Sequence, residues 1–400
     1  MKGTVAVSNA KYSDVPVQAE KQQKSEAKEA VAAPSQRVAS IDALRGFDMF
    51  FITGGSALVI GICAALGHPK AWLAMQMKHV DWIGLAQHDT IFPLFLFLAG
   101  ASWPFSLAAQ QKRGRSTPAI QLKLLARAAA LFLIGLSFGG ILKFNPDFRL
   151  PSILGFIGLS WGVAATLSMY VKKSWKLLAT AAAFLAGCYL LQHFCLAPGA
   201  PEGANPYVVE NNIAAYWDRT LWPNHLYLKG KYDPESFFSL PCGAAIALFG
   251  VLAGRLLKRQ DGPSPARKSL LLAAWAAAAA LAACVFEFGF GNPVIKKLGT
   301  PSYFLYASAY SFAMLALFHW IVDVLGWKRW TVAFAPVGKN SILAYVLMMM
   351  GVSGTIQKFL FSGLCKWADK WGQALAGLTS YLVVWAILYF LMRKKIFIKV

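Results

Sequence analysis

Long apolar stretches alternate with short polar segments along most of the chain. Ten stretches of about 20 residues carry few or no charges, and this is the length of helix that crosses a bilayer core of about 30 Å. They are residues 46–66, 90–110, 121–142, 151–171, 175–196, 237–257, 269–291, 302–325, 333–353 and 374–392. The pattern predicts an all-α fold, a polytopic transmembrane helix bundle with about ten spans and at most eleven.

The ninth stretch differs from the others. Pro336, Gly338, Lys339 and Asn340 interrupt it near its start. Irregular backbone is tolerated at membrane depth only where it faces protein or a water-filled cavity. We therefore expect this segment to begin as re-entrant backbone.

The composition excludes a single soluble domain. Of the 400 residues, 57% are hydrophobic and only 14% are charged, and the mean hydropathy is +0.49. Too few polar side chains remain to cover a core of this size in water. Lipid is the solvent that such a chain needs.

The basic residues indicate an orientation. If the amino terminus lies inside, most of the 39 lysine and arginine residues fall in segments that the ten spans place inside. Short basic loops stay cytoplasmic, so both termini are predicted to be cytoplasmic. The net charge of +21 is spread over six segments. It therefore indicates topology rather than binding of nucleic acid, which requires one basic face.

The first 37 residues have a different composition from the rest. They are polar and lack an apolar core, so they are expected to form a disordered cytoplasmic tail. Residues 38–400 then form one transmembrane domain. Its two long outside loops are predicted at residues 67–89 and 197–236.

The six cysteines fall mainly within or at the ends of predicted spans, and no CxxC motif occurs. This spacing favours neither a disulfide framework nor a zinc site. No metal is expected.

Two histidines and two acids gather just before the second span. His79, Asp81, His88 and Asp89 lie within eleven residues, on the predicted outer side. An imidazole exchanges protons near neutral pH, and a nearby carboxylate orients it and stabilises its cation. Such a group activates an amine or a hydroxyl for attack on an acyl group. The pattern alone does not choose between His79 and His88, and each could instead be a structural histidine.

Charged residues also occur within spans, where each one is costly. Asp42, Arg45 and Asp48 are three positions apart, so they share one helix face. They form either an ion-pair latch or a site in which Arg45 faces an anionic cofactor. Lys339 likewise either extends to water or reaches a cofactor phosphate.

The loop at 197–236 combines aromatic side chains with amides. Trp217 and its aromatic neighbours could stack on sugar rings while Asn211, Asn212, Asp218 and Asn224 bind hydroxyl groups. The alternative is the belt of Trp and Tyr that most membrane proteins place at the interface.

Six motifs in order resemble one family of membrane enzymes. They are LRGFDMF, KHVDWIGLAQHDTIFPLFLFLAG, RLPSILGFIGLS, YDPESFFSLPCGAAIALFGVLAG, KKLGTPSYFLYASAY and GKNSILAY. From about Val38 to the carboxyl end, the chain resembles the acyltransferases related to heparan-alpha-glucosaminide N-acetyltransferase, including their bacterial DUF5009 relatives. The resemblance implies a dimeric bundle that takes acetyl from cytoplasmic acetyl-CoA and delivers it to a glucosamine, or to another amino sugar or glycan, across the membrane.

The resemblance also implies roles for individual residues. His79 matches the family's catalytic histidine, Asp89 matches the acid before Phe-Pro, and Asn340 matches a Gly-x-Asn pattern. His79 is expected to act as a general base or as an acetyl carrier. Arg45, Lys339 and Asn340 are expected to bind the donor, and Asp81, Trp82, His88 and Trp217 the acceptor. The setting implied is a bacterial inner membrane with the active loop in the periplasm.

One departure concerns the first span. The better-known members carry an Asn near its outer end, whereas this chain reads ITGGSALV. Thr53 or Ser56 would have to supply that polar contact, and the acceptor is therefore open.

A transporter or flippase for a sugar or a lipid-linked glycan is the competing class. Buried charges and a broken helix at 336–340 are equally expected there. A second broken helix in the other half of the chain is not evident, which favours the enzyme.

Overall fold

The structure, a computed structural model, describes residues 38–398. Their regular structure is helical, apart from one isolated antiparallel bridge between Leu196 and Asn212. The tail predicted at residues 1–37 lies outside the described part of the chain. The prediction of an all-α bundle is confirmed.

Nine helical segments of the described chain are long and apolar enough to cross a membrane, or ten if one bent pair counts as a span. The helices that build them, with the short helices between them, follow in chain order. They are α2 (Ala39–Phe50), α3 (Ser56–Ala65), α4 (Trp72–Gln76), α5 (Ile91–Lys112), α6 (Thr117–Phe138), α7 (Ile153–Tyr170), α8 (Ser174–Phe194), α9 (Ile213–Leu221), α10 (Leu240–Lys258), α11 (Pro265–Cys284), α12 (Pro301–His319), α13 (Ala335–Lys339), α14 (Ser341–Met349), α15 (Val352–Trp367) and α16 (Gly372–Arg393).

The ninth predicted span is divided into three helices. Helix α13 ends at Lys339, and α14 and α15 form the bent pair, with an angle of 70° between them. The bend lies at Gly351, whose φ of 72° is in the left-handed region that suits glycine. The interruption near residue 340 is thus present, but the main bend comes later than Pro336 and Gly338 suggested. Helix α15 was not predicted, because Lys358 and Lys366 break its apolar run.

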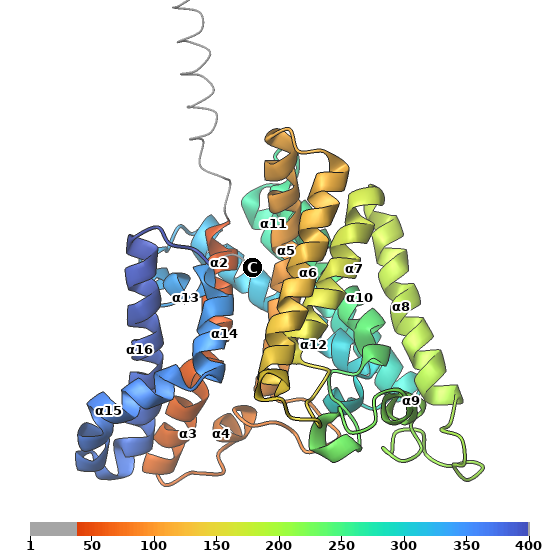
Figure 1. The fold of residues 1–400 in the computed structure, drawn as a ribbon. Coiled ribbons are helices and arrows are strands. Elements are labelled where there is room, and N and C mark those ends of the chain that lie inside the picture. Colours follow the sequence, from red (N-terminus) through yellow and green to blue (C-terminus); the bar gives the residue numbers. More distant parts are fainter. Residues whose placement is uncertain (1–37, 399–400) are drawn as a thin grey trace, which may run out of the picture. The chain divides into compact units, whose positions relative to one another are not determined.

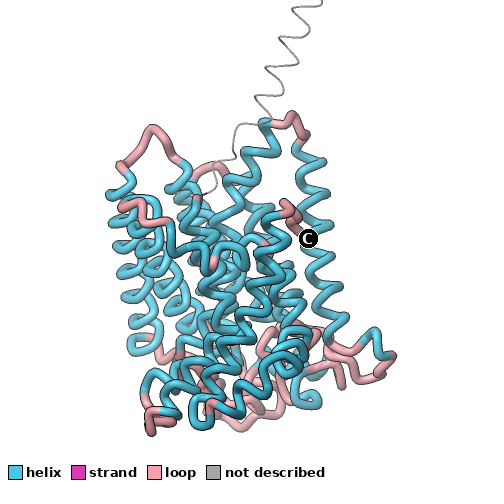
Figure 2. Tube along the Cα trace, turned by 90° about the vertical axis from the view of Figure 1, so that its left-hand side faces the viewer, coloured by secondary structure: helices cyan, strands magenta, loops and turns pink. Residues whose placement is uncertain are grey.

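The helices gather into two groups (Figure 1). Helices α2, α3 and α13–α16 form one group, and α5–α12 form the other, with α2 also contacting α5 and α12. The view turned by 90° shows the long helices running roughly alongside one another, with most connecting loops at the two ends (Figure 2). We call the end that carries segments 66–86 and 195–236 the loop end. The chain enters the bundle at Val38 and leaves it after Arg393 at the opposite end.

A kink divides the first span. A π-helical turn, Phe51–Gly55, joins α2 to α3, and Gly54 within it has a φ of 157°. A Cβ at Gly54 would lie 2.2 Å from the carbonyl oxygen of Gly377 in α16, so only glycine fits this contact. The extra residue in the turn shifts the backbone bonding, and the N–H of Ser56 donates to Phe51. Turns of this kind often mark functional sites.

The loop before α10 is held by a buried ion-pair cluster. Arg149, which precedes α7, donates to Asp233 at 2.6 and 2.9 Å and also to Glu235. The guanidinium lies 5.0 Å from the ring centre of Tyr227. The segment at 227–235 is therefore fixed to the loop end by charge, although it has no long helix of its own.

Asp218 of α9 lies beside this cluster. It is only 1% exposed, and neither carboxylate oxygen has a hydrogen-bond partner among the described residues. Burial raises the pKa of Asp218 from its ordinary value of 3.8 to about 7, and the negative Asp233 adds to this, against a smaller lowering by the nearby Ser236 hydroxyl. The carboxyl group is thus neutral in the folded protein at mildly acidic pH.

The Asp218→Asn variant is expected to be more stable than the natural chain at pH 8 but equally stable at pH 4. Between about pH 4 and pH 7 the folded Asp218 keeps a proton that the unfolded chain has lost, so the free energy of unfolding falls as pH rises. The limiting gain for the variant is about 4 kcal/mol, because a tenfold change in proton affinity corresponds to about 1.4 kcal/mol. Thermal unfolding in detergent at both pH values measures it.

The matched control is Asp147→Asn, at an exposed position of a neighbouring loop. It should change the thermal unfolding midpoint by the same small amount at both pH values. A stability gain for Asp218→Asn that does not depend on pH would contradict the assignment of a buried, protonated carboxyl group.

Candidate active site

The candidate site lies at the loop end, where the segment after α4 meets the start of α5. His79 Nδ1 lies 2.7 Å from Asp89 Oδ1. The Asp89 side chain is 1% exposed, whereas the His79 side chain is 55% exposed. A buried acid thus supports an imidazole that faces outward, and the two residues predicted to be catalytic are in direct contact.

Asp89 is held on all sides. It belongs to a short 3₁₀ turn, Gln87–Thr90, that leads into α5. Its Oδ2 accepts the N–H of Val80 at 3.2 Å and that of Ala86 at 3.3 Å. Its backbone carbonyl accepts the hydroxyl of Tyr303, a buried residue of α12, at 2.8 Å. The loop therefore closes around the carboxylate, and this contact fixes the position of His79.

Lys296 is the third member of the cluster, and it was not predicted from the sequence. Its Nζ lies 3.1 Å from Asp89 Oδ1 and 3.0 Å from His79 Nδ1. It comes from the short turn Lys296–Leu298 before α12, more than 200 residues from the histidine. Only its place in the KKLGTPSY motif could have drawn attention to it.

These contacts determine the tautomer of His79 and therefore which of its ring nitrogens is free to react. An ionised carboxylate can only accept a hydrogen bond, so His79 Nδ1 carries the proton and donates it to Asp89. Lys296, which can only donate, then bonds to Asp89 rather than to the protonated Nδ1. In the neutral imidazole this tautomer leaves Nε2 without a proton, as a base or nucleophile requires.

The second histidine lies against the first. The ring centres of His79 and His88 are 4.6 Å apart. His88 Nδ1 lies 3.1 Å from the hydroxyl oxygen of Ser56, the first residue of α3. Thr53 instead donates to the carbonyl of Met49 in its own helix, at 2.9 Å. Of the two hydroxyl groups considered for the missing Asn, only that of Ser56 faces the histidines.

The residues predicted to bind the acetyl acceptor do not all lie at the candidate site. Trp82 donates from its indole to the carbonyl of Tyr207 at 3.1 Å, and the backbone carbonyl of Asp81 accepts from Lys297 at 2.6 Å. Both residues border the His79 segment. Trp217 lies in α9, 39% exposed, with its ring against Tyr216. No contact with the histidines brings it to the site.

The residues predicted to bind the acetyl donor lie at the opposite end of the bundle. Arg45 donates to Ser102 at 2.6 Å and pairs with Asp42 at 3.6 Å. Lys339 contacts the sulfur of Met392 at 3.7 Å. The amide of Asn340 binds the chain that follows α16, accepting from the N–H of Ile398 at 3.0 Å and donating to the carbonyl of Ile396 at 3.2 Å.

The predicted latch forms only in part. Arg45 and Asp42 are paired, but Asp48 is 1% exposed and its Oδ2 has no hydrogen-bond partner in residues 38–398. Tyr310 of α12 lies close to Gln87 and Thr90, and it is also close enough to Asp48 for an electrostatic interaction. Polar groups thus continue from Arg45 along α2 toward the histidines.

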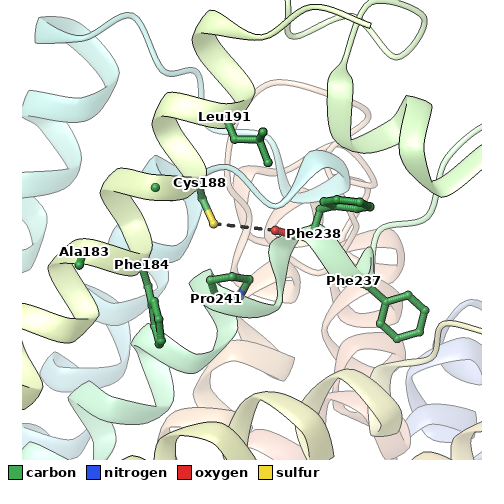
Figure 3. Close-up of a pocket in the computed structure, with 8 residues that line it drawn as sticks. Ala183, Phe184, Cys188, Leu191, Phe237, Phe238 and Pro241 are labelled. Carbon is green, nitrogen blue, oxygen red and sulfur yellow. Dashed lines mark hydrogen bonds between the residues drawn. The ribbon is translucent and has the colours of Figure 1, made fainter. Parts of the chain in front are cut away.

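A separate apolar cavity of about 320 Å³ lies between α8 and the start of α10 (Figure 3). The thiol of Cys188 points across it toward the carbonyl oxygen of Phe238, at 3.8 Å. Its lining residues are Ala183, Phe184, Gly187, Cys188, Leu191, Phe237, Phe238 and Pro241. None of the predicted site residues lines it. Among residues 38–398, no group of three or more His, Cys, Asp or Glu side chains is placed to hold a metal ion.

The fold and this site define a polytopic helical membrane protein with a histidine–aspartate–lysine cluster at one end. No protein-family model matches the chain. The heparan-alpha-glucosaminide N-acetyltransferase of Mus musculus is 28% identical over 78% of the chain and 54% of its own length. The protein of the same name in Homo sapiens is 27% identical over 92% of the chain and 61% of its own length.

The chain is therefore a relative of these transferases, as the six motifs predicted. It spans between about half and three fifths of the length of the curated relatives that it matches.

Replacing Asp89 with alanine is expected to destabilise the protein strongly. The change removes the acceptor for Lys296, His79 and two backbone N–H groups. Breaking a buried charge pair from one side typically costs about 3 to 5 kcal/mol. The thermal unfolding midpoint in detergent measures the loss.

Asp81→Ala is the matched control, since its exposed side chain makes none of these contacts. It should leave the midpoint unchanged. Equal midpoints for the two variants would show that the Asp89 cluster does not hold the loop.

Proposed function

We propose that this protein is a membrane acetyltransferase, which moves an acetyl group from acetyl-CoA to an amino sugar or glycan on the other side of the membrane. The observation that carries the proposal is the His79–Asp89–Lys296 cluster, with a half-exposed imidazole on a buried acid. The two relatives named heparan-alpha-glucosaminide N-acetyltransferase support the reaction type.

His79 acts on the acceptor. Its free Nε2 takes the proton from the attacking amine or hydroxyl, and Asp89 stabilises the imidazolium that forms. Lys296 compensates the charge of Asp89 and places a positive charge beside the reacting carbonyl, where negative charge develops. A covalent acetyl group on His79 is the rival scheme for the same residues.

The donor binds at the opposite end of the bundle. Arg45, Lys339 and Asn340 lie there, and a guanidinium and an ammonium group suit the phosphates of acetyl-CoA. Arg45 and Ser56 are eleven positions apart on the first span, about 16 Å at 1.5 Å per residue. The basic connecting segments support an orientation with the Arg45 end in the cytoplasm, where the donor is made, and the histidines on the far side.

The acceptor binds around the histidine at the loop end. Trp82 and Asp81 border His79, and His88 lies beside it, so these residues are suited to hold a sugar ring and its hydroxyl groups. The buried Arg149–Asp233 pair keeps the neighbouring loop in place, and Trp217 supplies an exposed aromatic face there. The setting proposed is a bacterial inner membrane, with the protein as a homodimer.

Transport is less well supported. Residues 38–398 contain one span-length helix pair with a sharp bend between its members, formed by α14 and α15 in the second half of the chain. Transporters built from inverted repeats place broken helices in corresponding positions of both halves. The purified protein should therefore consume acetyl-CoA rather than only move a sugar.

The His79→Ala variant is expected to lose transferase activity by at least about a hundredfold, because the general base is removed. The assay follows release of CoA thiol from acetyl-CoA with a panel of amino sugars and glycan fragments, using protein in detergent. The unfolding midpoint is measured on the same sample, so that loss of fold is not mistaken for loss of chemistry.

The control for this experiment is His68→Ala, an exposed histidine that follows α3. It should keep the activity of the natural chain. Full activity in a folded His79→Ala variant would exclude the proposed role, and the absence of transfer by the natural chain to any acceptor of the panel would exclude the proposed function.

A further inference from the structure

The pair formed by Ser56 and His88 is not used by the scheme above. Its hydroxyl oxygen and imidazole nitrogen lie 3.1 Å apart, and the His88 ring packs against the His79 ring with their planes tilted by 60°. Ser56 is 8% exposed, so this hydroxyl is largely shielded from bulk solvent. Activation of a serine as a nucleophile requires a base within hydrogen-bond reach of its hydroxyl, and the His88 imidazole meets this requirement.

The bonding of Ser56 differs from that of several other helical serines, although Ser269 of α11 likewise bonds to a histidine, His319, at 2.7 Å. Ser102, Ser308 and Ser311 each donate to the carbonyl four residues earlier, at 2.6 to 2.7 Å. That bond occupies the hydroxyl and is the common choice for serine in apolar helices. The Ser56 hydroxyl bonds to His88 instead, directly after the π-helical turn and the kink at Gly54.

We propose that Ser56 is a second catalytic residue, which accepts the acetyl group from the donor as an ester and passes it to the acceptor held at His79. This inference rests on the proposed acetyltransferase function. The reaction is divided between two neighbouring residues. Ser56 lies on the same span as Arg45, and His79 lies in the loop that follows this span. His88, between them, contacts both.

In the first step the Ser56 oxygen attacks the carbonyl carbon of the thioester. His88 Nδ1 takes the hydroxyl proton, the carbon–sulfur bond breaks, and the thiolate leaves with that proton as CoA thiol. His88 is then neutral again, and Ser56 carries an acetyl ester. This step requires the tautomer of His88 that is protonated at Nε2.

In the second step the acceptor amine attacks the carbonyl carbon of the ester. His79 Nε2 takes the amine proton, and the ester carbon–oxygen bond breaks. His88, which has exchanged tautomer between the two steps and is now protonated at Nδ1, gives that proton to the Ser56 oxygen and accepts the proton of His79 at Nε2, which restores the tautomer of the first step. The products are the acetylated amine and the free serine. The two steps together convert one thioester and one amine into one amide and one thiol.

The ester differs chemically from the other two routes. Direct transfer leaves no acetyl group on the protein in the absence of acceptor. An acetyl-imidazole is released by hydroxylamine at neutral pH, whereas an alkyl ester resists neutral hydroxylamine and is released by alkaline hydroxylamine. The location and the lability of bound acetyl therefore identify the route.

The experiment uses the purified full-length chain with radiolabelled acetyl-CoA and no acceptor, quenched in acid. The natural chain should retain label that survives neutral hydroxylamine, and mass spectrometry should place the acetyl group on Ser56. Ser56→Ala should retain no label and transfer at least about a hundredfold more slowly, since it lacks the nucleophile. Ser56→Cys should retain label that neutral hydroxylamine removes, because a thioester replaces the ester.

The matched control is Ser137→Ala, which removes an exposed hydroxyl bonded within its own helix to Leu133. It should keep both label and activity. If Ser56→Ala fails to fold, the changed lability of the label on Ser56→Cys still tests the assignment.

The outcomes separate the two proposals. Label on His79, or full transferase activity in a folded Ser56→Ala variant, overturns the role of Ser56 and leaves the acetyltransferase function standing. Neither label nor transfer by the natural chain, with any acceptor tested, overturns the function itself.

Discussion

The carboxylate of Asp89 is the contact on which the loop end of this protein depends. One buried acid accepts from His79, Lys296 and two backbone N–H groups, and so joins the segment after α4, the start of α5 and the turn before α12. An unpaired carboxylate at this depth would be strongly unfavourable. The donors around it therefore lock the loop, and the imidazole is oriented as a consequence of the same bonds.

The first span connects this cluster with the opposite end of the bundle. It starts beside α13, where Gly46 and Gly338 pack closely, and it ends beside the histidines. The kink at Gly54 turns Ser56 away from ordinary helix bonding and toward His88. Polar groups on the first span thus lie along the boundary between the two helix groups.

The sequence predicted most of the membrane architecture because apolar stretches of span length have few other uses. The first eight predicted spans and the tenth coincide with helices to within a few residues at most ends. The first helix begins earlier than predicted, at Ala39. The bend at Gly351 and the helix after it were missed, since α15 mixes lysines with its apolar residues. The cluster of His79, Asp81, His88 and Asp89 was evident because its members are close in sequence, and the family resemblance then pointed to His79 and Asp89. Lys296 was not predicted, because its partners are more than 200 positions away.

The amino-acid sequence by itself determined the solvent of this protein, the approximate number of its spans and the cluster of histidines and acids before the second span, because these depend on local composition and spacing. Only the tertiary structure decided which hydroxyl of the first span faces a histidine, which nitrogen of His79 is free, and that a distant lysine completes the cluster. These features depend on directions of side chains in separate helices. Packing between the helices sets those directions, and no local pattern in the sequence encodes them.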